Sequence, residues 1–145
     1  NVNGPMRLTR LLVPKMKVFC GGVGARETML SAESAMGVII NIGGIAGIES
    51  MSGAAAAFSA SKHALVGWTR AIYSALRHDN IKVMLVNPAF VNTPMVSTGP
   101  FKDQVIYENM IQPEDVASVC LLPFHVSAGC VPAEVTLRLA LSATK

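Results

Sequence analysis

Two short apolar runs, separated by one long helical pattern, constrain the fold of this chain more than any other feature. Residues 37–42 form a continuous β-branched run that ends in a glycine-rich loop, which is typical of a strand buried on both faces of a parallel sheet. Residues 54–77 carry apolar side chains at helical spacing, and residues 81–86 form a second strand-like run. A strand, a helix and a strand in this order predict a right-handed crossover and parallel pairing.

Further elements flank this central unit. Residues 1–17 carry an apolar stripe at helical spacing, and Pro14 should bend or end that helix. Residues 113–122 open with a proline and two acidic residues, as helix N-termini often do. Residues 135–141 alternate between apolar and other side chains, which predicts a final strand at a sheet edge. The segment 18–36 shows no sustained period, and we interpret it as a loop or insertion.

These elements predict an α/β fold: a partial, Rossmann-like, doubly wound parallel sheet with three strands and crossover helices. The length suits a single domain spanning residues 1–145. A hydrophobic fraction of 51% against 14% charged residues excludes an intrinsically disordered chain. The three cysteines are odd in number and widely spaced, so we expect reduced thiols and a cytoplasmic protein rather than a disulfide scaffold.

Charge and apolar patterning exclude several classes of partner. The net charge of +3 comes without any run of five like charges, which argues against nucleic-acid binding. No apolar stretch reaches the roughly eighteen residues of a membrane helix, so no membrane association is expected. The three histidines lack the spacing of metal ligands, and we expect no metal site.

Residues capable of ligand binding or catalysis follow the two central strands. In open α/β sheets, ligands bind beyond the carboxyl ends of the strands. Those ends correspond here to residues 41–44 and 87–93. Lys62 lies in the first turns of the long helix, four residues after Phe58. Because residues four apart share a helix face, we expect these two side chains to point the same way.

This arrangement resembles the short-chain dehydrogenase/reductase family. Residues 58–65, Phe-Ser-Ala-Ser-Lys-His-Ala-Leu, fit seven of the eight positions of the family signature Y-x-A-S-K-x-A-L. Further matching segments are residues 1–4, 37–47 and 87–95, in the family's order. The chain is similar to the C-terminal part of a family member. The resemblance therefore implies a partial domain, a fragment that lacks the N-terminal dinucleotide-binding half.

The resemblance also implies roles for individual residues. The family's catalytic Asn-Ser-Tyr-Lys set falls on Asn1, Gly44, Phe58 and Lys62, with one extra residue before Phe58. In the family, the lysine holds the nicotinamide ribose and lowers the pKa of the tyrosine, which exchanges a proton with the substrate oxygen. The serine donates a hydrogen bond to that oxygen, and the asparagine supports a water relay.

The implied cofactor is NAD or NADP, and the implied substrate is a small-molecule carbonyl or alcohol. By the same resemblance, Lys62 would hold the nicotinamide ribose. The neighbouring cofactor-binding positions would be Pro88, Ala89, Val91 and Thr93, with alanine at 89 where the family usually has glycine.

Two substitutions bear on catalysis. Phe58 carries no transferable proton, and losing a positioned general acid costs about 10²–10⁴-fold in rate. Gly44 lacks the hydroxyl that would stabilise developing charge on the substrate. The family's glycine-rich phosphate turn is missing as well, because residues 22–27 hold only the first two glycines of G-x-G-x-x-G.

Three interpretations stay open. The first is the C-terminal part of an NAD(P)-dependent oxidoreductase, inactive alone. The second is a catalytically dead relative that serves as a binding or oligomerisation module, and the third is a truncated remnant that does not fold stably. In the family, two equivalent helices form a four-helix dimer interface. We therefore expect a homo-oligomer formed through the helices at residues 5–17 and 54–77.

Overall fold

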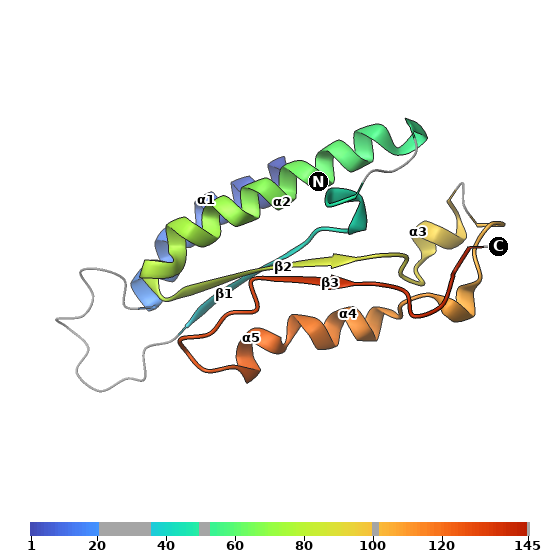
Figure 1. Ribbon diagram of the computed structural model, residues 1–145. Helices are drawn as coiled ribbons and strands as arrows, with labels where there is room; N and C mark the ends of the chain where they lie inside the picture. Colours follow the sequence, from blue (N-terminus) through green and yellow to red (C-terminus); the bar gives the residue numbers. More distant parts are fainter. Residues whose placement is uncertain (21–35, 50–52, 100–101, 145) are drawn as a thin grey trace.

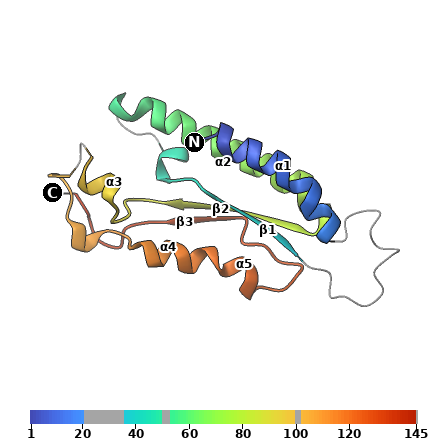
Figure 2. The same ribbon diagram turned by 180° about the vertical axis from the view of Figure 1, so that it is seen from behind.

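The computed structural model describes residues 1–20, 36–49, 53–99 and 102–144. Three parallel strands lie between two layers of helices, as the two opposite views show (Figures 1 and 2). The strands are β1 (Gly37–Ile42), β2 (Ile81–Pro88) and β3 (Glu134–Leu137). One face carries α1 (Asn3–Phe19) and α2 (Ala56–Leu76), and the other carries α4 (Pro113–Cys120) and α5 (Leu122–His125).

Parallel pairing sets the order β1-β2-β3. Gly37 of β1 pairs with Ile81, and the register continues to Ile42 opposite Val86. Helix α2 connects the two strands and packs on β2, which confirms the predicted strand-helix-strand unit. A short helix, α3 (Pro94–Ser97), and four 3₁₀ turns complete the described chain. The turns are Ile45–Gly47, Gly53–Ala55, Arg77–Asp79 and Tyr107–Asn109.

The central strand β2 holds the core of the molecule. All eight of its residues are buried, whereas β1 is mostly half-buried and its last residue, Ile42, is 44% exposed. The expectation that residues 37–42 are buried on both faces was wrong. In the part of the chain that the structure describes, β1 is an edge strand, so solvent reaches its residues along the edge that meets no other strand.

Prolines shape the helices differently from the prediction. Pro14 does not end α1, which continues to Phe19. The proline lies on the exposed side of the helix, where one lost backbone hydrogen bond is tolerated while Val13 and Met16 pack against the core. The helix predicted over residues 113–122 ends at Cys120, and a separate short helix, α5, begins at Leu122 with Pro123 in its first turn, where proline fits.

Two further boundaries also differ. The final strand ends at Leu137 and not at residue 141, because its partner β2 ends at Pro88, opposite Leu137. The position of β3 at the sheet edge is confirmed. Of the predicted loop or insertion at 18–36, the first two residues belong to α1, and residues 21–35 lie outside the described part.

Two helix ends have local side-chain explanations. Asn80 has φ 57° and ψ 34°, the left-handed conformation that ends the segment after α2. At the start of α4, Asp115 accepts a hydrogen bond from the backbone N–H of Gln112 at 2.8 Å, as expected for an acidic first turn. No helix within the described ranges is long and apolar enough to span a membrane.

Lys82 is a buried cation in the middle of the sheet. Its Nζ donates hydrogen bonds to the carbonyl oxygens of Pro123 and Ser127, both at 2.9 Å. These two bonds join β2 to the first turn of α5 and to the loop that follows the helix.

We expect Lys82→Met to lower the free energy of unfolding by about 1–3 kcal/mol, because it leaves two carbonyl oxygens without their donor. Lys102→Met, at an exposed position, should change it by no more than about 0.5 kcal/mol. Urea denaturation of both variants measures the difference. Equal stability of the two variants would contradict a structural role for Lys82.

Candidate active site

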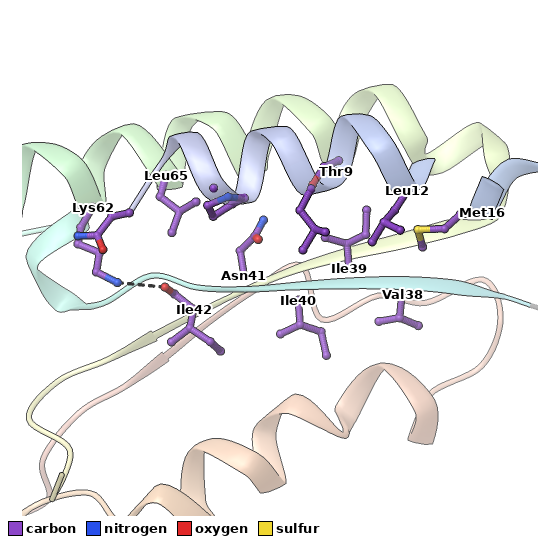
Figure 3. A pocket seen from close by; sticks show the side chains of 14 residues that line it. Thr9, Leu12, Met16, Val38, Ile39, Ile40, Asn41, Ile42, Lys62 and Leu65 are labelled. Atoms are coloured by element: carbon purple, nitrogen blue, oxygen red, sulfur yellow. Dashed lines mark hydrogen bonds between the residues drawn. The ribbon is translucent and has the colours of Figure 1, made fainter. Parts of the chain in front are cut away.

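The candidate site lies where β1 and β2 end (Figure 1). Parallel pairing brings the loop after β1 beside Pro88, the last residue of β2. We call residues 43–44 of this loop the glycine corner. Lys62, in the second turn of α2, donates a hydrogen bond from Nζ to the carbonyl oxygen of Ile42 at 3.1 Å (Figure 3). The ammonium group is thereby held at the end of β1.

Phe58 lies beside Lys62, as the four-residue spacing predicted. The Nζ atom of Lys62 is 5.7 Å from the centre of the phenyl ring, within the range of a cation–π contact. The ring is 40% exposed. Burial lowers the pKa of the Lys62 ammonium, because removal from water disfavours the charged form. The aromatic ring stabilises the cation but has no proton to exchange.

Gly44 has a backbone conformation that a side chain would strain. It is buried and has φ +152° and ψ 157°, a region that is essentially restricted to glycine. Space itself is available, since a Cβ atom would lie 3.7 Å from the carbonyl oxygen of Pro88 and 4.0 Å from Cε of Lys62. A serine here would fit the volume and strain the backbone.

Asn1 lies on the α1 side of Lys62. Its Nδ2 donates a hydrogen bond to Oγ of Ser61 at 2.8 Å, and that hydroxyl donates to the carbonyl oxygen of Phe58 at 2.7 Å. Asn1 and Lys62 also line the same groove. The structure thus brings four predicted site residues together with Pro88. They are Asn1, Gly44, Phe58 and Lys62.

The other predicted cofactor positions follow β2 along the chain. The backbone N–H of Ala89 donates to the carbonyl oxygen of Leu137 at 2.9 Å. Val91 forms a parallel bridge with Ile111, and Thr93 Oγ1 donates to the carbonyl oxygen of Val91 at 3.3 Å. These contacts fix the loop after β2 but do not join its side chains to Lys62.

Asn87 is a site residue that sequence reasoning missed. It is completely buried, and its Oδ1 accepts a hydrogen bond from the backbone N–H of Gly44 at 3.2 Å. Its Nδ2 donates to Oε1 of Glu134 at 3.2 Å. The available signal was an amide at the end of a mostly apolar strand, because a buried polar group requires partners. The sequence interpretation placed Asn87 in the ligand-binding strand end at residues 87–93 but gave its side chain no role.

A groove of about 760 Å³ runs between α1 and β1 (Figure 3). Its walls are mostly apolar, with Leu8 and Leu12 on α1 and Ile39 on β1, and Lys62 lies at one end. Val38 and Ile40 point to the opposite face of the sheet. Across the residues that the structure places, no group of three acidic, histidine or cysteine side chains forms a metal site.

We expect Gly44→Ala to lower the free energy of unfolding by about 1–3 kcal/mol, the cost of a non-glycine residue in this backbone region. Gly67 provides a matched control within α2, where a Cβ atom meets nothing within 4 Å. Gly67→Ala should raise stability by about 0.5–1 kcal/mol, because alanine favours helix. Thermal unfolding distinguishes the two opposite signs, and stabilisation by both substitutions would refute the strain at Gly44.

Comparisons with known proteins identify the family of this chain. The sequence matches the family described as short chain dehydrogenase over residues 1–102. Human 3-oxoacyl-[acyl-carrier-protein] reductase is 36% identical over 86 residues, which cover 59% of this chain and 34% of the relative. Bovine 3-hydroxyacyl-CoA dehydrogenase type-2 is 42% identical over 87 residues, covering 60% and 32%. The chain thus spans about a third of the length of these curated relatives.

Solved structures share the fold. A 3-oxoacyl-[acyl-carrier protein] reductase with bound NAD from Brucella melitensis has a TM-score of 0.66 and 21% identity, with 94% of this chain and 47% of that chain covered. The parallel α/β architecture predicted from the sequence is therefore confirmed. Because the family match covers more than half of the sequence, this chain belongs to the short-chain dehydrogenase/reductase family.

Proposed function

We propose that this chain forms the nicotinamide-facing part of an NAD- or NADP-dependent oxidoreductase that acts on a carbonyl or alcohol, and that it is inactive alone. The observation that supports this most is the Lys62 ammonium, held at the ends of β1 and β2 beside Gly44 and Pro88. Ligands of open α/β sheets bind at this edge.

The residues present fit one half of a dinucleotide. An ammonium group has three N–H donors, and Lys62 gives one of them to Ile42, which leaves donors for the hydroxyls of a ribose. A nicotinamide, when bound, supplies or accepts the hydride. The sequence contains no complete G-x-G-x-x-G turn for the pyrophosphate, so this chain accounts for the ribose contact only.

Proton transfer is the step that these residues do not support. Phe58 occupies the position of the family's tyrosine beside Lys62, and its ring cannot donate to a substrate oxygen. Gly44 is a second obstacle, because it lacks the serine hydroxyl of the family. Its backbone conformation would also be strained by a serine. Both features favour the second candidate function, a catalytically inactive module that binds or associates.

Self-association is the form of that second function with most support. Leu8 and Leu11 on α1 are 58% and 69% exposed, and apolar side chains gathered on one surface mark interaction sites. We place the homo-oligomer contact on the helices at residues 5–17 and 54–77. The free cysteines agree with a reducing, cytoplasmic setting, and the scattered charge does not favour nucleic acid.

Lys62→Met should weaken NADH or NADPH binding, because it removes the ribose donor, while Phe58→Tyr, made in a full-length context that supplies the rest of the dinucleotide site, should raise ketone reduction by about 10²–10⁴-fold over the same protein with Phe58. Nucleotide fluorescence measures the first effect and NAD(P)H oxidation with a panel of ketones measures the second. Lys102→Met and Phe58→Leu are the matched controls. Nucleotide binding that survives Lys62→Met would contradict the proposed ribose contact.

If Phe58→Tyr does not raise the rate of ketone reduction while nucleotide binding is intact, the chain is better described as an inactive binding module. Adding Gly44→Ser to Phe58→Tyr tests whether the missing hydroxyl limits the rate.

Leu8→Glu together with Leu11→Glu should convert the oligomer to a monomer, because two carboxylates in an apolar contact are costly to desolvate. Size-exclusion chromatography with light scattering measures the mass. Leu121→Glu, at an exposed position in the other helical layer, is the control and should leave the mass unchanged. A parent chain that is already monomeric at high concentration would contradict the self-association.

A further inference from the structure

Asn87 connects three strand ends through one buried side chain. On one side, its amide oxygen accepts a hydrogen bond from the backbone N–H of Gly44, in the loop after β1. On the other side, its amide nitrogen donates to Glu134, the first residue of β3. Asn87 itself lies near the end of β2. The side chain therefore spans the sheet at the edge where the candidate site is formed.

The chemistry of the two partners requires an amide at this position. A backbone N–H needs an acceptor, whereas an ionised carboxylate needs a donor, and a single amide group offers both. Aspartate would offer acceptors only, and leucine would offer neither. Because the Asn87 side chain is completely buried, surface water does not replace a partner that its amide loses.

The network continues from Glu134 to α2. Arg70 donates from Nε to Oε2 and from its terminal nitrogen to Oε1, both at 3.0 Å. This bidentate contact fixes the Glu134 carboxylate in one orientation. Helix α2 thus supports Asn87 through Arg70 and Glu134, and it also carries Lys62, which approaches the same loop from the other side.

The glycine corner is held from both directions. Lys62 donates to the carbonyl oxygen of Ile42, directly before the corner, and Asn87 accepts from the N–H of Gly44. The fit against Asn87 is tight, since a Cβ atom on Gly43 would lie 2.2 Å from Oδ1 of Asn87. Gly43, between the two contacts, also donates its backbone N–H to the carbonyl oxygen of Val86 at 2.8 Å, so the Asn87 side chain completes a corner that the β1–β2 ladder begins.

We propose that Asn87 is a positioning residue that acts through the glycine corner on Lys62. By orienting the corner, Asn87 fixes the Ile42 carbonyl to which the Lys62 ammonium is anchored. The relevance of this anchor to nucleotide binding rests on the function proposed above. The hydrogen bond to Gly44 does not rest on that function, and its protection from exchange can be measured independently.

The test is an exchange of polarity between positions 87 and 134. In Asn87→Asp, two carboxylates face each other at neutral pH. Their repulsion should move the side chain at position 87 away from Gly44, so the Gly44 N–H should lose protection. In Asn87→Asp with Glu134→Gln, the new carboxylate accepts from both Gly44 and the glutamine amide, and the bridge is restored with reversed polarity. The charged groups around position 87 are Glu134 on β3, Arg70 behind it, and Lys62 beyond the corner.

Amide hydrogen exchange of Gly44, followed by NMR on the whole chain, is the primary measurement. We expect exchange about tenfold faster in Asn87→Asp at neutral pH, consistent with one lost hydrogen bond. Slow exchange should return in the double variant. Exchange at Met84, in the centre of β2, reports global unfolding and should change less.

Asn92→Asp is the matched control, because Asn92 donates to Gln112 and not into this network. Gly44 exchange that is equal in Asn87→Asp and Asn92→Asp would overturn the proposal. A double variant that folds and leaves Gly44 unprotected would overturn it as well. If Asn87→Asp does not fold at neutral pH, Gly44 protection in the double variant decides the question.

NADH affinity of the same variants provides the second measurement. It should fall in Asn87→Asp and recover in the double variant, in parallel with Gly44 protection. If the parent chain binds no nucleotide while Gly44 exchange follows the expected pattern, the proposed ribose contact fails and the positioning of the corner stands. Affinity that does not follow Gly44 protection would overturn the action of Asn87 on Lys62.

Discussion

The parallel pairing of β1 with β2 is the constraint on which the rest of the structure depends. Residues that follow parallel strands meet at one edge of the sheet, so the loop after β1 and the end of β2 lie side by side although they are more than forty residues apart. Helix α2, as the crossover between the two strands, brings its first turns to the same edge. The position of Lys62 is therefore a consequence of topology as much as of its local sequence.

Much of this arrangement could be predicted from the order of apolar runs. The bounds of β1 agree with the apolar run at residues 37–42. Boundaries that depend on a partner could not be predicted. Strand β3 ends where β2 ends, and Pro14 is accommodated because neighbouring side chains hold α1 on the core.

The candidate site divides in the same way. Phe58 and Lys62 are one helical turn apart, so their proximity follows from local geometry and was predicted correctly. The partners of Asn87 are separated from it by 43 and 47 positions in the sequence, and no local pattern contains that information. The positive φ of Gly44 is likewise set by the contacts of the folded loop.

The edge position of β1 has a consequence beyond the site. Its residues carry neither charge nor proline, the two devices by which natural sheets commonly block the addition of strands. By the alternation of a parallel ladder, the backbone groups of Val38 and Ile40 point away from β2. Within the described ranges no further strand covers this edge, and an exposed edge of this composition is a template for strand addition. We therefore expect association through β1 to compete with folding in concentrated preparations of this chain, driven by the backbone and independent of Lys62.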